Sequence, residues 1–406
     1  MNAEVRFIAD LPPTPTQAVC GACGSGELEC FFKLPELPVN CIVLYATQEA
    51  ARNVPKGAIE LAFCRRCGAV SNLAFDVAKL NYDPSYDNSL HFSPSFQNYA
   101  EELARDLIAR HDLHGKNIIE VGCGNGEFLS LVCSMGDNRG VGFDPAFIPG
   151  RANLNAGRGI TIVRDYYSES HTDCKADFVI CRHVLEHIPT PQQFLRTVRA
   201  TLRQNPDAAI FFELPDASFV FRNKGIWDVI YEHCFYYSSG ALTRLFSACG
   251  FEVQNVSSTF HGQYLCLAAR VSARDTGLLG DAGDDLQTMR EDLSKFSQEY
   301  RSTQTYWEDM LCGFAKDGKR VVLWGAGAKG AMFLNAFANI PSLEYIVDVN
   351  PHKWGLYTPG TGQKVVSPEF LTQYRPEVLL IANPNYCDEI SRKVTNLGIA
   401  PELFSI

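Results

Sequence analysis

The sequence predicts an α/β protein made of a small cysteine-rich N-terminal domain, a doubly wound sheet and a C-terminal Rossmann-like α/β domain. Two Cys-x-x-Cys pairs precede residue 80, and apolar strands then alternate with helical patterns. The alternation pauses and restarts near the C-terminus, and each stretch contains a glycine-rich turn after an apolar strand. We therefore expect domains at 1–80, 81–275 and 319–406, with a helical connector at 276–318.

Composition argues against several classes of partner. The 406 residues carry a net charge of -10 without a run of Lys or Arg, so we expect no nucleic-acid partner. No uninterrupted apolar stretch is long enough to cross a bilayer, so we expect no membrane partner. The first residues lack the pattern of a secretory signal, and 15 cysteines without one favour a reducing cytoplasm.

The cysteine pairs predict a structural zinc site in the first domain. Each pair forms a tight knuckle in which two intervening residues let both sulfurs face one ion, and Gly24 and Gly68 follow where the backbone turns. Cys30 and Cys41 lack this context and are expected in the core. Two unrelated cysteine pairs, or a redox pair, are the alternatives. The four expected zinc ligands are Cys20, Cys23, Cys64 and Cys67.

A second motif predicts a ligand site in the next domain. The apolar stretch Asn117–Val121 is followed by Gly122-Cys123-Gly124-Asn125-Gly126 and then by a helical pattern. Asp144 lies 22 residues after Gly122, at the end of another apolar strand, where a carboxylate can bind ribose hydroxyls. The spacing is tighter than the dinucleotide fingerprint Gly-x-Gly-x-x-Gly.

The motif resembles motif I of class I methyltransferases, which bind S-adenosylmethionine (SAM). The sulfonium of SAM is cationic, and the carboxylates of Glu120 and Asp144 suit it. An NAD site and an ordinary strand–turn–helix are the alternatives. The residues expected at the cofactor are Glu120, Gly122, Cys123, Gly124, Asp144 and His183, with Asp165 and Tyr166 near the adenine.

Three clusters of polar and aromatic residues could supply a base for methyl transfer. They lie at 81–89, at 181–189 and at 227–238. The second cluster places His183, Glu186 or His187 at the carboxyl end of a central strand, where α/β sheets bind ligands. The third pairs Glu232 with His233 among aromatic residues. The alternatives are a solvated Glu–His pair, tyrosines that only pack, and a histidine that caps a strand end.

Taken together, these features resemble the sugar C-methyltransferase family, whose members methylate C3 of nucleotide-linked 4-keto-deoxysugars in antibiotic pathways. The resemblance rests on the knuckles, the Glu-Val-Gly-Cys-Gly-Asn-Gly motif, the Tyr-Glu-His cluster and the last domain, in the same order along essentially the whole chain. It implies that His233 removes the proton next to the ketone and that tyrosine and histidine side chains steady the enolate. The catalytic residues that it implies are Tyr82, Tyr86, His187, Tyr231, Glu232 and His233.

The chain departs from the family pattern at two places. Where the family reads His-Gly-Gly-Ser, this chain reads His261-Gly262-Gln263-Tyr264, and no contact is assigned there. Where the family reads Tyr-His-Glu-His, this chain reads Ile230-Tyr231-Glu232-His233 and lacks the first histidine.

The last domain carries a second glycine motif. Apolar residues with helical spacing, from Leu286 to Trp307, predict the connector that leads to it. Gly325-Ala326-Gly327-Ala328-Lys329-Gly330 matches the dinucleotide fingerprint, and Asp348 lies 23 residues after Gly325. Taken alone, this motif favours NAD. The resemblance implies instead that the domain holds the nucleotide end of the sugar, and a purely structural role is the third alternative.

The sequence therefore predicts a SAM-dependent C-methyltransferase with structural zinc, acting on a nucleotide-sugar or a related small molecule. A methyltransferase of the same architecture acting on oxygen or nitrogen is the first alternative. An oxidoreductase that uses the second glycine motif, and a binding module that retains a cofactor site, are the others.

Overall fold

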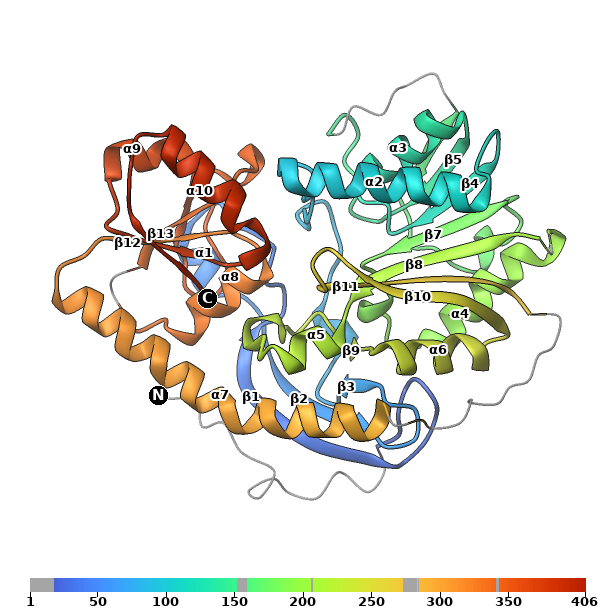
Figure 1. Ribbon diagram of the computed structural model, residues 1–406, viewed down its shortest axis with the longest axis horizontal. Coiled ribbons are helices and arrows are strands. Elements are labelled where there is room, and N and C mark those ends of the chain that lie inside the picture. The colour runs from blue at the N-terminus through green and yellow to red at the C-terminus, as the bar shows by residue number, and fades with distance from the viewer. Residues whose placement is uncertain (1–17, 152–158, 206, 273–282, 284, 341–342) are drawn as a thin grey trace.

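The computed structural model describes residues 18–151, 159–205, 207–272, 283, 285–340 and 343–406 (Figure 1). Among these residues, no helix combines the length and apolar character needed to cross a membrane. Short 3₁₀ helices connect many of the main elements. They are η2 (Val77–Lys79), η3 (Glu169–His171), η4 (Leu185–His187), η5 (Leu202–Gln204), η6 (Ile226–Asp228), η7 (Pro351–Lys353), η8 (Pro368–Phe370) and η9 (Pro384–Tyr386).

The N-terminal unit is an antiparallel sheet with the strand order β1-β2-β3-β9. Its first strands are β1 (Leu28–Pro38), β2 (Lys56–Cys64) and β3 (Val70–Asn72), and helix α1 (Gln48–Arg52) lies between β1 and β2 in the chain. The last strand, β9 (Phe235–Tyr236), comes from a distant part of the sequence and pairs with β3. The N-terminal sheet therefore includes residues that follow the Glu-His pair.

The central unit confirms the expected α/β fold, with a mixed sheet in the order β10-β11-β8-β7-β4-β5-β6. Strands β4 to β8 are parallel, whereas β10 and β11 form an antiparallel hairpin at one edge. The strands are β4 (Asn117–Val121), β5 (Arg139–Phe143), β6 (Ile160–Val163), β7 (Phe178–Arg182), β8 (Ala209–Pro215), β10 (Phe251–Thr259) and β11 (Tyr264–Val271).

Helices cover both faces of this sheet, which explains why its inner strands are apolar throughout. In β7, Phe178 and Ile180 pack with α2 (Pro94–His111) and α3 (Glu127–Gly136). The alternate residues Val179 and Cys181 pack on the other face with α4 (Pro191–Thr201) and α6 (Ser239–Ala248). Helix α5 (Ala217–Arg222) follows β8.

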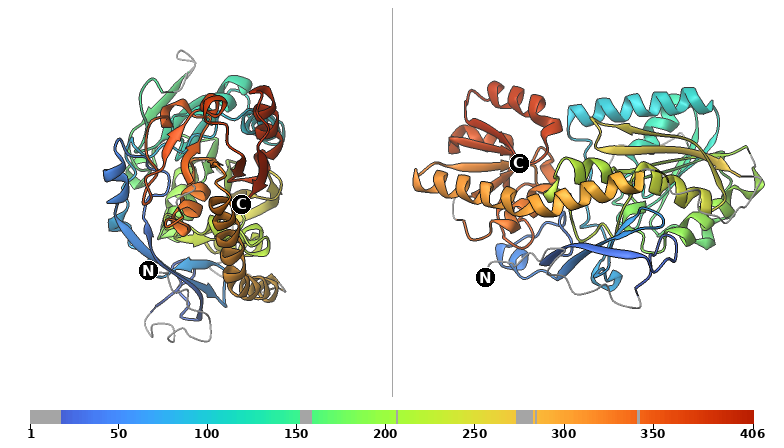
Figure 2. Two further views of the ribbon diagram at one scale, coloured as in Figure 1. Left: turned by 90° about the vertical axis from the view of Figure 1, so that its left-hand side faces the viewer. Right: turned by 60° about the horizontal axis from the view of Figure 1, so that its bottom comes forward.

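The expected connector is a single long helix, α7 (Asp285–Lys316). The apolar residues that predicted it, among them Met289, Phe296 and Trp307, are buried along one side. The Ser297 hydroxyl donates to the Phe31 carbonyl oxygen of β1 at 2.9 Å. Helix α7 thus runs along the N-terminal sheet and on to the C-terminal unit (Figures 1 and 2).

The C-terminal unit is a parallel sheet in the order β14-β13-β12-β15-β16. Its strands are β12 (Val321–Trp324), β13 (Leu343–Val347), β14 (Lys364–Val366), β15 (Val378–Ile381) and β16 (Glu402–Ser405). The helices are α8 (Ala328–Ala336), α9 (Leu371–Tyr374) and α10 (Cys387–Asn396). This is the Rossmann-like arrangement that the second glycine motif predicts.

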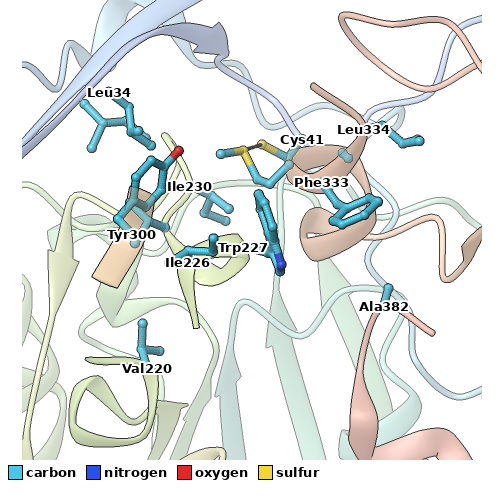
Figure 3. Close-up of a cluster of buried hydrophobic side chains, with 14 of the residues drawn as sticks. Leu34, Cys41, Val220, Ile226, Trp227, Ile230, Tyr300, Phe333, Leu334 and Ala382 are labelled. Atoms are coloured by element: carbon cyan, nitrogen blue, oxygen red, sulfur yellow. Dashed lines mark hydrogen bonds between the residues drawn. The ribbon is translucent and has the colours of Figure 1, made fainter. Parts of the chain in front are cut away.

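One hydrophobic core joins four parts of the chain. Figure 3 shows Leu34 of the N-terminal sheet, Trp227 of η6, Tyr300 of α7 and Phe333 of α8 in the same cluster. The Trp227 ring lies edge-on to that of Phe333, with centroids 5.1 Å apart. The N-terminal sheet, the connector and the C-terminal unit therefore stabilise one another through shared burial of apolar surface.

Candidate active site

A cavity of about 1060 Å³ lies between the two α/β units. Both glycine loops line it, with Gly122 and Gly124 on one side and Gly325 and Gly327 on the other. Parallel sheets bind ligands at the carboxyl ends of their strands, and these loops follow β4 and β12. The cavity is therefore the place where a cofactor and an acceptor would meet.

Polar contacts join the two units beside the cavity. Glu389 of α10 accepts a hydrogen bond from the Ser93 hydroxyl at 2.7 Å and another from the Ser95 backbone N–H at 2.9 Å. These residues form the N-terminus of α2, so a carboxylate of the C-terminal unit caps a helix of the central unit. Nearby, the side-chain amide oxygen Oε1 of Gln263 accepts a hydrogen bond from the side-chain amide of Asn385 at 2.9 Å.

The first glycine loop has the geometry that its sequence predicts. Gly122 and Gly124 have φ angles of +69° and +57°, which favour glycine. A Cβ atom at Gly122 would lie 2.1 Å from Val184 Cγ2, so the loop leaves no room for a side chain there. Asp144 accepts hydrogen bonds from the backbone N–H groups of Gly124 and Ala146, both at 2.8 Å. The carboxylate is thereby fixed beside the loop.

Glu120 supplies a second buried carboxyl group in this half of the cavity. It is 2% exposed and lines the cavity. Its Oε2 atom has no hydrogen-bond partner among the residues that the structure describes. Burial raises the pKa of Glu120 to about 8. A cationic ligand would favour the ionised form of this group.

The remaining residues expected at the cofactor divide into two groups. Cys123 and Tyr166 line the cavity. Asp165 is not among the lining residues of the described chain, because its side chain is 61% exposed and accepts a hydrogen bond from the Tyr166 backbone N–H at 2.8 Å. The place of Asp165 near the adenine stays a prediction, because its neighbour Tyr166 lines the cavity.

His183 lines the cavity but sits between two carboxylates. Its ring nitrogens lie 3.8 Å from Glu186 Oε1 and 2.7 Å from Glu213 Oε1. Burial alone would lower the pKa of His183, but Glu186 and Glu213 outweigh it and raise the pKa to about 9. His183 is therefore a cation near neutral pH, which makes it a poor neighbour for a positively charged ligand.

The network around Glu213 was not anticipated from the sequence. Its carboxylate accepts hydrogen bonds from Arg182 at 2.9 Å and from the Tyr99 hydroxyl at 2.6 Å. Arg182 also stacks on the Phe128 ring, 4.0 Å from its centroid. Glu213 lies in β8, the strand next to β7. Ligand sites form at the carboxyl ends of neighbouring parallel strands, and this rule could have identified Glu213 from the sequence.

Most of the expected catalytic residues lie together in a second part of the cavity. The Tyr82 hydroxyl lies 3.0 Å from His187 Nδ1, and the same nitrogen lies 3.0 Å from the Glu232 carbonyl oxygen. The rings of His187 and His233 have centroids 5.0 Å apart, and those of Tyr82 and Tyr86 are 4.8 Å apart. All these residues line the cavity.

The two imidazoles are neutral bases. Burial and the nearby His187 lower the pKa of His233 to about 3, and burial also lowers the pKa of His187. Both rings therefore present a lone pair at neutral pH. A backbone carbonyl oxygen can only accept a hydrogen bond, so His187 Nδ1 must be the donor to the Glu232 carbonyl oxygen. We therefore assign Nδ1 as the protonated nitrogen of His187.

The carboxylate that accompanies these imidazoles is Glu186 rather than Glu232. The backbone N–H of Cys41 donates to Glu232 Oε1, and no hydrogen bond joins Glu232 to His233 in the described part of the chain. Burial raises the pKa of Glu232 to about 7. Donor atoms of Glu186, His187 and His233 lie within 4.8 Å of one another, a set that could also hold a metal ion. The expectation that Glu232 orients His233 is therefore corrected.

Tyr231 is not a catalytic residue, because the structure buries it completely. Its side chain is absent from the cavity lining of the described residues, and its hydroxyl accepts from the Asp76 backbone N–H at 2.9 Å. Its ring stacks on Phe75, with centroids 5.6 Å apart. Tyr231 therefore joins the Glu-His segment to the N-terminal unit.

The expected zinc ligands lie together in the N-terminal unit. Cys20 Sγ is 3.7 Å from Cys67 Sγ, and Cys23 Sγ is 3.5 Å from Cys64 Sγ. Sulfur ligands about 2.3 Å from a tetrahedral zinc ion lie about 3.8 Å apart. The cluster therefore fits a zinc ion and would leave no ligand position open to water.

The low pKa of His233 has a consequence for stability. Between pH 6.5 and pH 3 the unfolded chain binds a proton at this histidine that the folded chain does not, so folding stability falls as the pH falls. We expect wild type to lose about 1 kcal/mol more per pH unit than His233→Gln across this range. Urea unfolding measured at several pH values checks this. Parallel curves for the two proteins would contradict the assigned burial.

The second glycine loop repeats the geometry of the first. Asp348 accepts from the backbone N–H groups of Ala326 at 2.9 Å and of Asn350 at 2.8 Å. Here, however, Lys353 Nζ lies 3.2 Å from the carboxylate. In addition, Lys329 in the loop forms an ion pair with Asp228 of the central unit at 2.9 Å. Asp348 is thus neutralised by a lysine, whereas no lysine or arginine among the described residues forms an ion pair with Asp144.

Comparison with known proteins assigns both α/β units. Residues 96–256 match a family model described as a methyltransferase domain, and residues 282–399 match one described as a C-methyltransferase C-terminal domain. The chain is 28% identical over 292 residues to the C-methyltransferase NovU of Streptomyces niveus, a match that covers 68% of each chain.

Other similarities cover smaller parts of the chain. The ubiquinone biosynthesis O-methyltransferase of Proteus mirabilis is 27% identical over 140 residues, which are 33% of this chain and 52% of that protein. Among solved structures, the magnesium protoporphyrin IX methyltransferase of Synechocystis with bound S-adenosylhomocysteine has 18% identity and a TM-score of 0.34. That match covers 44% of this chain and 84% of the other.

Proposed function

We propose that this SAM-dependent methyltransferase transfers its methyl group to a carbon atom next to the ketone of a nucleotide-linked keto-deoxysugar. Its class rests on the methyltransferase domain and the C-methyltransferase C-terminal domain, while the sugar acceptor and the residues involved are the proposal. The main support is that one cavity joins the cofactor loop, a pair of neutral imidazoles, tyrosine hydroxyls and the second glycine loop.

The cofactor half of the cavity suits SAM because it is acidic. When bound, SAM supplies an electrophilic methyl group on a positively charged sulfur. The Asp144 carboxylate is placed to accept hydrogen bonds from ribose hydroxyls, and the ionised form of Glu120 would offset the positive charge. Gly122 and Gly124 let the backbone approach the ligand closely.

In the proposed reaction, His233 takes the proton from the carbon next to the ketone, and the electron pair of the broken C–H bond delocalises onto the carbonyl oxygen as an enolate. This carbon would then form a bond to the methyl group as the S–CH3 bond breaks, with the bonding pair left on sulfur and S-adenosylhomocysteine as the leaving group. A neutral imidazole can accept this proton, and Glu186 nearby stabilises the imidazolium that results. The hydroxyls of Tyr82 and Tyr86 are the donors that can face the enolate oxygen.

The C-terminal unit is proposed to hold the nucleotide end of the acceptor. The backbone N–H groups at the start of α8 and the Lys329 side chain form a favourable place for a diphosphate. Lys353 neutralises the Asp348 carboxylate. A dianionic ligand is repelled less by this ion pair than it would be by an unpaired carboxylate. The side-chain Nδ2 of Asn350, 1% exposed and unpartnered within the described chain, can donate to the ligand from this side.

The sulfur cluster of the N-terminal unit is proposed to bind zinc in a structural role. A closed set of four thiolates has no position for substrate, so the ion would contribute folding free energy and no step of the reaction.

Exchange of the hydrogen next to the ketone tests the proposed function. With enzyme and S-adenosylhomocysteine in deuterated water, we expect the keto-deoxysugar nucleotide to gain deuterium at that carbon, because proton removal precedes methyl transfer. NMR or mass spectrometry reports the exchange. A protein that methylates the acceptor without ever exchanging this hydrogen would contradict the proposal.

The alternative is methyl transfer to oxygen or nitrogen. It is supported by the similarity of the central unit to ubiquinone biosynthesis O-methyltransferases. Such a reaction needs no carbon acid to be deprotonated, so the same exchange experiment separates the two functions.

A further inference from the structure

We propose that the N-terminal four-cysteine unit, defined as residues 18–80, positions the imidazole of His233 in the cavity. This inference rests on the proposed role of His233 as the base. The segment from Tyr231 to Tyr236 carries that histidine and runs along the four-cysteine unit on both sides of it.

The residues before His233 are anchored by side-chain contacts. The Tyr231 hydroxyl accepts a hydrogen bond from the Asp76 backbone N–H at 2.9 Å. Its ring fills the space next to Gly57 of β2, where a Cβ atom would lie 2.2 Å away from it. Glu232 Oε1 accepts from the Cys41 backbone N–H. Both side chains are therefore held by residues of the four-cysteine unit; Tyr231 lies outside the cavity lining, whereas Glu232 also borders the cavity.

The residues after His233 are anchored through the backbone. The Asn72 backbone N–H donates to the Cys234 carbonyl oxygen at 3.0 Å. Strand β9 then pairs with β3, with Ser71 opposite Phe235. These bonds fix the direction of the chain immediately beyond the imidazole.

The cysteine loop itself touches this segment and the loop that carries His187. A Cβ atom added at Gly21, between Cys20 and Cys23, would lie 3.0 Å from Phe235 Cζ and 3.1 Å from the Pro189 carbonyl oxygen. The side-chain amide of Gln192 donates to the Ala22 carbonyl oxygen at 2.8 Å. A shift of the cysteine loop would therefore reach both imidazoles of the catalytic cluster.

Consequently, His233 lines the cavity between two stretches that are anchored to the four-cysteine unit, through Tyr231 and Glu232 before it and through the backbone of Cys234 and Phe235 after it. Reaction rates depend steeply on such placement, because a displacement of about 1 Å can cost about 100-fold in rate. The four-cysteine unit is thus inferred to set the distance between base and acceptor, in addition to stabilising the fold.

A matched pair of glycine substitutions tests the inference. Gly21→Val inserts a side chain between the cysteine loop and the Phe235 ring, whereas Gly26→Val places the same side chain where nothing lies within 4 Å of its Cβ. Neither glycine has a positive φ angle, so valine fits both backbones. Zinc content and S-adenosylhomocysteine affinity are measured in each variant as controls. We expect Gly21→Val to slow hydrogen exchange at the acceptor carbon about tenfold and Gly26→Val to leave the exchange rate unchanged.

Tyr231→Phe provides a second variant that adds no bulk. It removes the hydrogen bond to Asp76 and is expected to slow exchange in the same direction, with KM for SAM unchanged. Equal exchange rates in wild type, Gly21→Val and Tyr231→Phe would overturn the inference.

The His233 imidazole also gives a readout that does not depend on turnover. In 15N-labelled protein, we expect its ring resonances to shift in Gly21→Val and to stay in place in Gly26→Val. If the wild-type protein shows no hydrogen exchange at the acceptor carbon, the proposed function fails. The ring resonances of His233 would still show whether the four-cysteine unit positions this imidazole. Unshifted resonances in Gly21→Val would then refute that positioning.

Discussion

Replacing His233 by asparagine should reduce methyl transfer by about 1000-fold, since general-base catalysis contributes about 10²–10⁴-fold in enzymes. Asparagine keeps a polar side chain in the cavity but cannot take up a proton. Initial rates with saturating SAM measure the loss, and calorimetry with S-adenosylhomocysteine should show an unchanged affinity, because Asp144 and Glu120 lie in the other half of the cavity.

The matched control is His114→Asn, which changes an exposed histidine outside the cavity. It should have wild-type activity. Hydrogen exchange at the acceptor carbon should stop in His233→Asn together with methyl transfer. If exchange continued at the wild-type rate, another residue would be the base, and His187 would be the first to test.

Loss of one zinc ligand should have the largest effect on folding. We expect purified protein to contain zinc and Cys67→Ser to lose it. A structural zinc site contributes about 10 kcal/mol or more in small zinc-binding peptides, which is comparable to the whole stability of a typical domain. The exposed Cys312 offers a matched control, since Cys312→Ser should keep both the ion and the stability.

The pattern of unfolding will show how far the N-terminal unit is independent. The sequence alone suggests that residues 1–80 unfold before the rest. The structure places β9 in the same sheet as β1 to β3 and the N-terminal apolar residues in a core shared with α7 and α8. We therefore expect β9 and β3 to lose hydrogen-exchange protection together in Cys67→Ser. Protein without zinc at full stability would contradict the metal site.

Local features of the fold could be predicted from the sequence because they depend on neighbouring residues. The first glycine turn, with Asp144 at the end of the next strand, follows from rules for strand–turn–helix units. The cysteine knuckles follow from ligand spacing, and α7 follows from its apolar period. In each case, the residues that determine the structure lie close together in the chain.

The misplaced residues depend on contacts between distant segments. Tyr231 looked catalytic beside Glu232 and His233, but its hydroxyl meets Asp76, which is far away in the sequence. Glu232 likewise accepts a hydrogen bond from the backbone N–H of the distant Cys41. Glu186, rather than Glu232, is the carboxylate beside the imidazoles of His187 and His233. Sequence spacing does not encode such pairings, because they are set by how β9 docks against β3.

The cap on α2 bears on how the two α/β units are held together. Separating the two α/β units would expose the first turn of this helix by removing the Glu389 carboxylate from Ser93 and Ser95. A helix cap contributes about 1 kcal/mol. The Glu389 carboxylate therefore adds a small polar contribution to the association of the two α/β units, beside the apolar core that they share and the Lys329–Asp228 ion pair.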